Sequence, residues 1–208
     1  ESLPNNPIAV LSGPTFAAEV ARGLPTAVTI AASSIEFAKH LCEQLGSRTF
    51  RPYASNDVVG VEIAGALKNV IAIGCGIVIG KGLGENARTA LMTRGLREIT
   101  RLAVTLGAQP ETLMGLSGLG DLVLTCGSTQ SRNMSLGFAL GRGEALADIL
   151  KQRVSVTEGI TTSLAARQLG RTVNVETPIM DAVTSVLHEG MSIHAVMEKL
   201  LARPLTTE

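Results

Sequence analysis

The chain has 208 residues, of which 45% are hydrophobic and 17% are charged. This composition is too apolar for an intrinsically disordered chain, and the length suits one large domain or two small ones. Eighteen basic residues balance eighteen acidic ones, so no overall field draws the chain to nucleic acid or to an anionic membrane. Aromatic residues make up only 2%, which leaves little material for stacking on nucleotide bases.

The cysteines and the amino-terminal residues bear on the cellular compartment. Cys42, Cys75 and Cys126 have neither CxxC nor CxxH spacing, so they favour neither a disulfide framework nor a zinc site, and we expect no metal. The first ten residues contain no signal-peptide pattern and lack an initiator methionine. We therefore expect a cytoplasmic protein and a piece of a longer chain.

The first quarter of the chain alternates strand-like and helix-like segments. Strands are predicted at residues 8–13, 27–32 and 47–53. A helix from Pro14 to Gly23 and a second helix, capped by Ser34 and stopped by Gly46, would connect them. A β-α-β-α-β order implies parallel strands joined by helical crossovers. Because three strands are few for a sheet covered on both faces, we expect the second half of a doubly wound sheet.

Beyond the third strand the strand signals fade, which predicts a domain boundary near residues 54–56. Residues 1–55 would form the α/β domain, and residues 56–208 an all-helical domain. The clearest helix opens at Asn86 and closes at Gly107, with an apolar stripe at spacings of three and four. Capping and stop signals predict further helices at residues 132–140, 144–150, 158–169, 178–188 and 193–201.

Residues 58–80 form an apolar segment long enough to span a bilayer, but it contains Glu62 and, near its middle, Lys68. A lysine at the bilayer centre costs about 2.5 to 3.5 kcal/mol on insertion scales. We therefore predict a buried central helix and no membrane insertion. Glu62 and Lys68 are separated by about 600° of helical rotation, so they point to different faces and Lys68 needs a more distant partner.

Lys68 would emerge from a helix face of small and apolar residues. A lysine in such a place can give a proton to a carbonyl oxygen as it becomes a hydroxyl, and take it back in reverse. The alternative is a lysine whose stem packs while its head reaches solvent. Asp121, in the glycine-rich bend at residues 118–122, is the candidate partner of Lys68, although it could equally cap a helix.

Two further segments are candidates for ligand binding. Ser131, Arg132 and Asn133 open a predicted helix after a flexible loop, and backbone N–H groups with a guanidinium and an amide suit a phosphate monoester. A capping serine beside a solvated arginine is the alternative. The turn at residues 12–15 follows a strand, where doubly wound sheets bind ligands. The other glycine-rich segments fit no nucleotide-binding fingerprint.

Together these segments resemble the NAD(P)-dependent sn-glycerol-3-phosphate dehydrogenases of the bacterial soluble type, over nearly the whole chain. The matching stretches are SGPTFAAEV at 12–20, VEIAGALKNVIAIGCGI at 61–77, GLSGLGDLVLTC at 115–126, SRN at 131–133 and VTEGI at 156–160. The resemblance implies a Rossmann-like cofactor domain followed by a helical substrate domain. It also implies reversible reduction of dihydroxyacetone phosphate to glycerol 3-phosphate with NADH or NADPH, for glycerophospholipid synthesis.

The resemblance further implies roles for individual residues. Lys68 is similar to the family's catalytic lysine, and Asp121 would orient it and the substrate hydroxyls. The substrate would also meet five other residues, Gly13, Thr15, Ser131, Arg132 and Asn133. The cofactor would meet Ala17, Arg132, Val156 and Glu158.

The resemblance stops at the amino end. The first β-α-β unit, with its glycine fingerprint for the pyrophosphate, has no counterpart, so we expect the chain alone to bind cofactor poorly and to expose a sheet edge. Two other interpretations stay open: the helical domain of a hydroxyacid or 6-phosphogluconate dehydrogenase, and a non-catalytic helical module that forms a homodimer. The choice between NAD and NADP also stays open.

Overall fold

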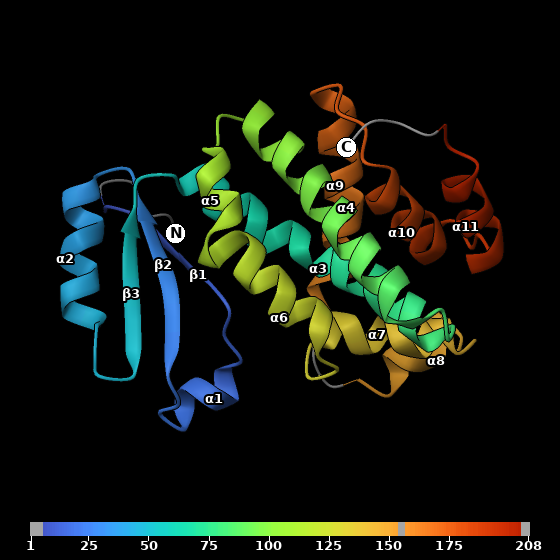
Figure 1. Ribbon diagram of the computed structural model, residues 1–208, viewed down its shortest axis with the longest axis horizontal. Coiled ribbons are helices and arrows are strands. Elements are labelled where there is room, and N and C mark those ends of the chain that lie inside the picture. The colour runs from blue at the N-terminus through green and yellow to red at the C-terminus, as the bar shows by residue number, and fades with distance from the viewer. Residues whose placement is uncertain (1–5, 154–156, 205–208) are drawn as a thin grey trace. The chain divides into compact units, whose positions relative to one another are not determined.

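Figure 1 shows the computed structural model of the chain, which describes residues 6–153 and 157–204. Among these residues three strands alternate with two helices up to Ser55, and every element from Val58 to Leu201 is a helix. This order confirms the predicted fold class, an α/β part followed by an all-α part.

The described residues cluster into two compact units. The first unit combines the described residues up to Lys68 with Ile99–Leu124, and the second combines Asn69–Glu98 with the described residues from Thr125 onward. The unit limits do not coincide with the change from strands to helices. The expected division at residues 54–56 into a cofactor domain and a substrate domain stays a prediction.

A small sheet forms part of the first unit. Its strands lie in the order β1 (Ala9–Ser12), β2 (Thr26–Ala32) and β3 (Phe50–Ser55). β2 and β3 run parallel, and the helix between them, α2 (Ile35–Leu45), packs on both strands (Figure 1). β1 runs antiparallel to β2, with Ser12 opposite Thr29. The expectation of parallel strands throughout is therefore wrong for β1.

The link between β1 and β2 explains the difference. Only Ala17–Ala21 (α1) is helical there, where a helix from Pro14 to Gly23 was predicted, and all five residues are at least partly exposed. A parallel crossover needs a connection that returns along the sheet, whereas this short helix lets the chain turn back. α2 begins and ends as predicted, with the Ser34 hydroxyl accepting an N–H of its first turn and Gly46 at its end.

The long central helix α3 (Val58–Gly80) starts at a carboxylate cap. Asp57 is buried; its Oδ1 accepts the N–H of Gly60 at 2.8 Å and its Oδ2 accepts the N–H of Gln109 at 2.8 Å. A Cβ at residue 60 would clash with this carboxylate, so the cap needs a glycine. Asp57 thereby ties the start of α3 to the start of α5 (Pro110–Met114).

α3 has the length and burial predicted for residues 58–80. Within the described part of the chain it is the one helix long and apolar enough to cross a membrane, and 61% of its most apolar stretch is buried in the protein. The core helix of a soluble protein has the same length and composition, so the burial supports the predicted core role.

The other predicted helices lie within a few residues of their predicted ranges. They are α4 (Gly84–Thr105), α7 (Arg132–Gly141), α8 (Leu146–Lys151), α9 (Glu158–Thr172), α10 (Pro178–His188) and α11 (Ile193–Leu201). Three short elements were not predicted: α5, the π-helix η1 (Leu116–Gly120) and α6 (Asp121–Gly127). Gly118 makes the π turn possible, since a Cβ there would clash with the carbonyl of Leu113 in α5.

In the second unit α3 and α7 pack backbone against backbone. A Cβ at Gly76 of α3 or at Gly137 of α7 would clash with backbone atoms of the opposite helix. Gly80 and Gly141 repeat this contact four residues further along each helix. This spacing of small residues allows two helices to approach closely, and it accounts for glycines that fit no nucleotide fingerprint.

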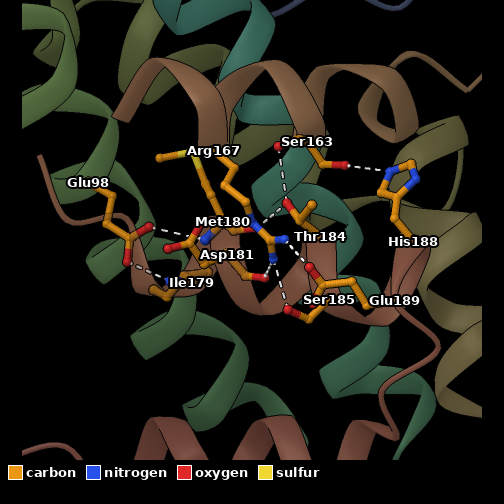
Figure 2. A network of polar contacts seen from close by, with 10 residues as sticks. All are labelled: Glu98, Ser163, Arg167, Ile179, Met180, Asp181, Thr184, Ser185, His188 and Glu189. Atoms are coloured by element: carbon orange, nitrogen blue, oxygen red, sulfur yellow. Dashed lines mark hydrogen bonds and ion pairs between the residues drawn. The ribbon is translucent and has the colours of Figure 1, made fainter. Parts of the chain in front are cut away.

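A polar network joins α9 and α10, as Figure 2 shows. The Arg167 guanidinium lies 3.2 Å from the Asp181 carboxylate, donates to the Ser185 hydroxyl at 2.8 Å and pairs with Glu189. Glu98 of α4 accepts two N–H groups in the first turn of α10, at 2.8 and 3.2 Å. These contacts supply the buried side chains with partners and fix the two helices to each other.

Candidate functional site

The pair of Lys68 and Asp121 lies in the first unit. Lys68 of α3 donates through Nζ to Oδ2 of Asp121, the first residue of α6. The Asp121 side chain is 2% exposed and that of Lys68 is 18% exposed. A buried carboxylate is costly without a cation or several donors. The predicted partnership is therefore confirmed, with the carboxylate buried and the ammonium group still reaching solvent.

Ser12, the last residue of β1, completes this cluster. Its Oγ lies 3.5 Å from the same Oδ2 of Asp121. Gly65, one turn before Lys68 on α3, leaves room for it, since a Cβ there would lie 3.0 Å from the Ser12 Oγ. From the sequence, only small and apolar residues were noted on the helix face around Lys68, and Ser12 was not connected with Asp121. The spacing of three between Gly65 and Lys68, which puts both on one helix face, was the available signal.

Three other predicted contact residues follow Ser12 along the chain. Gly13 is buried, and a Cβ there would lie 2.9 Å from the Cα of Val28, so the glycine lets the turn after β1 lie against β2. The Thr15 hydroxyl donates to the Gly13 carbonyl at 3.3 Å. Ala17 is exposed and begins α1. These observations explain the turn itself, and the contacts of its residues with substrate or cofactor stay predictions.

The tripeptide Ser131–Asn133 lies in the second unit at the start of α7. The Ser131 Oγ accepts the N–H of Met134 at 3.2 Å, so this serine is the N-cap, as the capping alternative predicted. Asn133 is buried; its Nδ2 donates to Asn69 Oδ1 at 2.9 Å and its Oδ1 accepts the N–H of Gly159 at 2.9 Å. Both side chains thus hold the first turn of α7 in place.

Arg132 is the exposed member of the tripeptide. Its side chain is 49% exposed, and its Nη2 donates to Oε1 of Glu158, the first residue of α9. Two of the predicted cofactor residues are therefore in direct contact, while Val156 lies outside the described residues. Since half-exposed ion pairs contribute little to stability, the guanidinium can exchange this carboxylate for a phosphate, which it can bind in a bidentate manner.

The two clusters offer different chemistry. The lysine of the first unit is held by a buried carboxylate and can carry and deliver a proton. The arginine of the second unit can bind an anion. Over residues 6–153 and 157–204 there is no group of three His, Cys, Asp or Glu side chains that could hold a metal ion.

Comparison with protein families gives two matches. The family described as NAD-dependent glycerol-3-phosphate dehydrogenase C-terminus matches residues 57–198, and its N-terminus counterpart matches residues 1–38.

Curated relatives match the chain along its length. A glycerol-3-phosphate dehydrogenase (NAD(P)+) from Rhodospirillum rubrum is 58% identical over 206 residues, which cover 99% of this chain and 59% of the relative. One from Caulobacter vibrioides is 55% identical over 208 residues, which cover 100% of this chain and 63% of the relative. The chain therefore spans about six tenths of the length of these relatives.

Solved structures show the same fold. The crystal structure of a glycerol-3-phosphate dehydrogenase from Coxiella burnetii superposes with a TM-score of 0.91 at 44% identity, covering 95% of this chain and 61% of that one. The enzyme from Saccharomyces cerevisiae gives a TM-score of 0.82 at 27% identity, covering 90% of this chain and 57% of that one.

Proposed function

Because the chain belongs to the NAD-dependent glycerol-3-phosphate dehydrogenase family, we propose that it carries the proton-transfer and substrate-binding residues of an enzyme that interconverts dihydroxyacetone phosphate and sn-glycerol 3-phosphate. The observation that carries the proposal is the ion pair between Lys68 and the buried carboxylate of Asp121. The family match favours this reaction over that of hydroxyacid or 6-phosphogluconate dehydrogenases.

Lys68 is the proposed proton donor. Reduction of a ketone adds a hydride to carbon and a proton to oxygen, so the developing alkoxide needs an acid beside it. The Lys68 ammonium group would give this proton in reduction and take it back in oxidation. Asp121 keeps the ammonium group in one place through their ion pair, and the Ser12 hydroxyl lies 3.5 Å from the same carboxylate oxygen.

Arg132 is the proposed ligand of the substrate phosphate. Its half-exposed guanidinium would leave Glu158 and bind the phosphate oxygens. Ser131 and Asn133 would support it, because the first caps α7 and the second ties that turn to Asn69 and Gly159. Gly13 and Thr15 would contact the substrate as the family resemblance implies.

Arg132 and Glu158 are also the proposed ligands of NAD or NADP, together with Ala17 and Val156. The donor set suits such a group, since a guanidinium binds phosphate and a carboxylate accepts from ribose hydroxyls. The cofactor, when bound, supplies the hydride. In this role the enzyme would be a cytoplasmic homodimer that provides glycerol 3-phosphate for glycerophospholipid synthesis.

Calorimetric titration of the chain with sn-glycerol 3-phosphate tests the substrate site. We expect a dissociation constant in the millimolar range or tighter, and a loss of about tenfold or more in Arg132→Ala, since a charge-assisted hydrogen bond contributes about 1.5 to 3 kcal/mol.

Arg142→Ala is the matched control. Arg142 follows α7 at its other end and stacks on Phe138, with the guanidinium carbon 6.0 Å from the ring centroid. This variant should bind like the wild type, and glycerol without the phosphate should not bind. A folded wild type that fails to bind, or Arg132→Ala binding equally well, would contradict the proposal.

A further inference from the structure

Arg153, in the segment after α8, reaches the first turn of α7. Its Nη1 donates to the carbonyl oxygen of Arg132 at 2.7 Å, and its Nη2 donates to the hydroxyl of Ser135 at 2.9 Å. The Ser135 hydroxyl itself donates to the Arg132 carbonyl at 3.1 Å. The three groups form a closed ring of hydrogen bonds around one backbone carbonyl.

The position of the Arg153 guanidinium costs free energy of desolvation, because the group is partly buried. Burial lowers the pKa of Arg153, and the charge of Glu144 acts in the opposite direction. The group stays charged at neutral pH. Its Nη1 also lies 3.5 Å from the hydroxyl of Thr157, the buried residue that precedes α9. These acceptors of the Arg153 guanidinium are the main chain of Arg132 and two hydroxyls, and none of the three is a carboxylate.

Arg132 is consequently fixed at two points that differ in strength. Its side chain pairs with Glu158 at a half-exposed position, where an anion can replace the carboxylate. Its carbonyl is bound by a planar guanidinium that satisfies two acceptors at once. When the side chain exchanges Glu158 for a ligand, the main chain that carries it remains in position.

We propose that Arg153 is a positioning residue for the anion site, because it fixes the main chain of Arg132. When the Arg132 guanidinium binds a phosphate monoester, the Arg132 backbone is then already ordered, and binding costs no further backbone conformational entropy there. This inference rests on the proposed function, in which Arg132 binds the substrate phosphate. Arg153 acts through Arg132 and makes no contact with the ligand.

A double-mutant cycle separates these roles. The affinity for sn-glycerol 3-phosphate is measured by amide chemical shifts in wild type, Arg132→Gln, Arg153→Gln and the double variant. We expect Arg153→Gln to weaken binding about tenfold in the wild-type background and to have no further effect when Arg132 is already Gln, since coupled residues are not additive. Equal losses in both backgrounds, or no loss, would overturn the positioning role.

Arg153→Lys distinguishes position from charge. It retains the positive charge, but an ammonium group lacks the planar fork that holds the Arg132 carbonyl and the Ser135 hydroxyl together. We expect it to bind as weakly as Arg153→Gln. Binding at the wild-type level would show that charge alone matters and would overturn the inference. Arg142→Gln, which removes a charge from the far end of α7, should bind like the wild type.

Three further outcomes are decided in the same series. If Arg153→Gln unfolds, Ser135→Ala removes one member of the ring and should weaken binding severalfold with the fold intact; an unchanged affinity would overturn the inference. If the wild type does not bind, or Arg132→Gln binds as well as wild type, the proposed function fails. If Arg132→Gln fails to bind while both Arg153 variants bind normally, only the role of Arg153 fails.

Discussion

At the scale of single residues, Lys68 and Asp121 depend on each other. Asp121 is buried, and Lys68 is its charged partner. Removing the cation of a buried ion pair leaves the buried charge without its neutralising partner, which costs about 3 to 5 kcal/mol. A loss of function in a Lys68 variant therefore reports on the proton-transfer role of Lys68 only if the substituted side chain still places a positive charge beside the Asp121 carboxylate.

The first prediction concerns stability. Lys68→Ala should lower the free energy of unfolding at neutral pH by about 3 kcal/mol, because it removes the ammonium group that neutralises the buried Asp121 carboxylate. Lys68→Arg should lower it much less, since a guanidinium still pairs with a carboxylate. Urea unfolding of the three proteins measures this. Equal stability of wild type and Lys68→Ala would show that the pair contributes nothing to the fold.

The second prediction concerns acid pH. Hydrogen bonds from Ser185 and Arg167 lower the pKa of Glu189 below its ordinary value of 4.5. A carboxyl group whose pKa is lower in the folded state stabilises the protein above its unfolded pKa, and this stabilisation is lost as the pH falls through the folded pKa. We expect the melting temperature to fall below about pH 4.5, and to fall less steeply in Glu189→Gln.

Melting curves between pH 6 and pH 3 compare wild type, Glu189→Gln and Glu111→Gln. Glu111 is an exposed glutamate of α5, so this control removes a carboxylate that is not a member of the Arg167 network. Curves of the same steepness in wild type and Glu189→Gln would count against the network as a source of stability.

At the scale of elements, the glycines of α3 and α7 set how closely these helices pack. The third prediction is that Gly137→Ala lowers the free energy of unfolding by about 2 kcal/mol, because its Cβ would clash with the backbone of α3 and overpacking a core costs about 1 to 3 kcal/mol. In the control Gly127→Ala, the new Cβ would meet only the Arg88 side chain, at 3.6 Å. Guanidinium unfolding showing equal stability for both variants would contradict the backbone contact.

Elements with strong local signals could be predicted from the sequence. Ser34 and Gly46 delimit α2, and the Thr177–Pro178 start signal defines the start of α10. Elements that depend on distant contacts could not be predicted. The π turn at η1 needs Gly118 against α5, and the direction of β1 follows from a link too short for a crossover.

The same distinction between local signals and distant contacts applies to the candidate site. Lys68 and Asp121 could be paired from sequence, because a lysine on an apolar helix face needs a distant carboxylate. The contacts of Ser12 and Arg153 could not, since each joins segments by geometry that only the folded chain creates.

At the scale of the whole molecule, the chain spans about six tenths of its curated relatives. A turnover assay is therefore made in a longer protein, in which the part of the Rhodospirillum rubrum relative that lies outside the match is joined to this chain. The interpretation as an assembly module makes the opposite prediction for such a protein. In that interpretation Lys68 supports association of the subunits, so a Lys68 variant would associate more weakly but keep its turnover.

The most direct measurement is kcat for dihydroxyacetone phosphate in this joined protein, with wild type, Lys68→Arg and the surface control Lys151→Arg. Arginine keeps the charge but cannot release a proton at neutral pH. We predict that Lys68→Arg folds and loses about 10² to 10⁴ in kcat, the usual contribution of a general acid, while Lys151→Arg retains activity. A folded Lys68→Arg protein with kcat within a few-fold of wild type would contradict the role of Lys68.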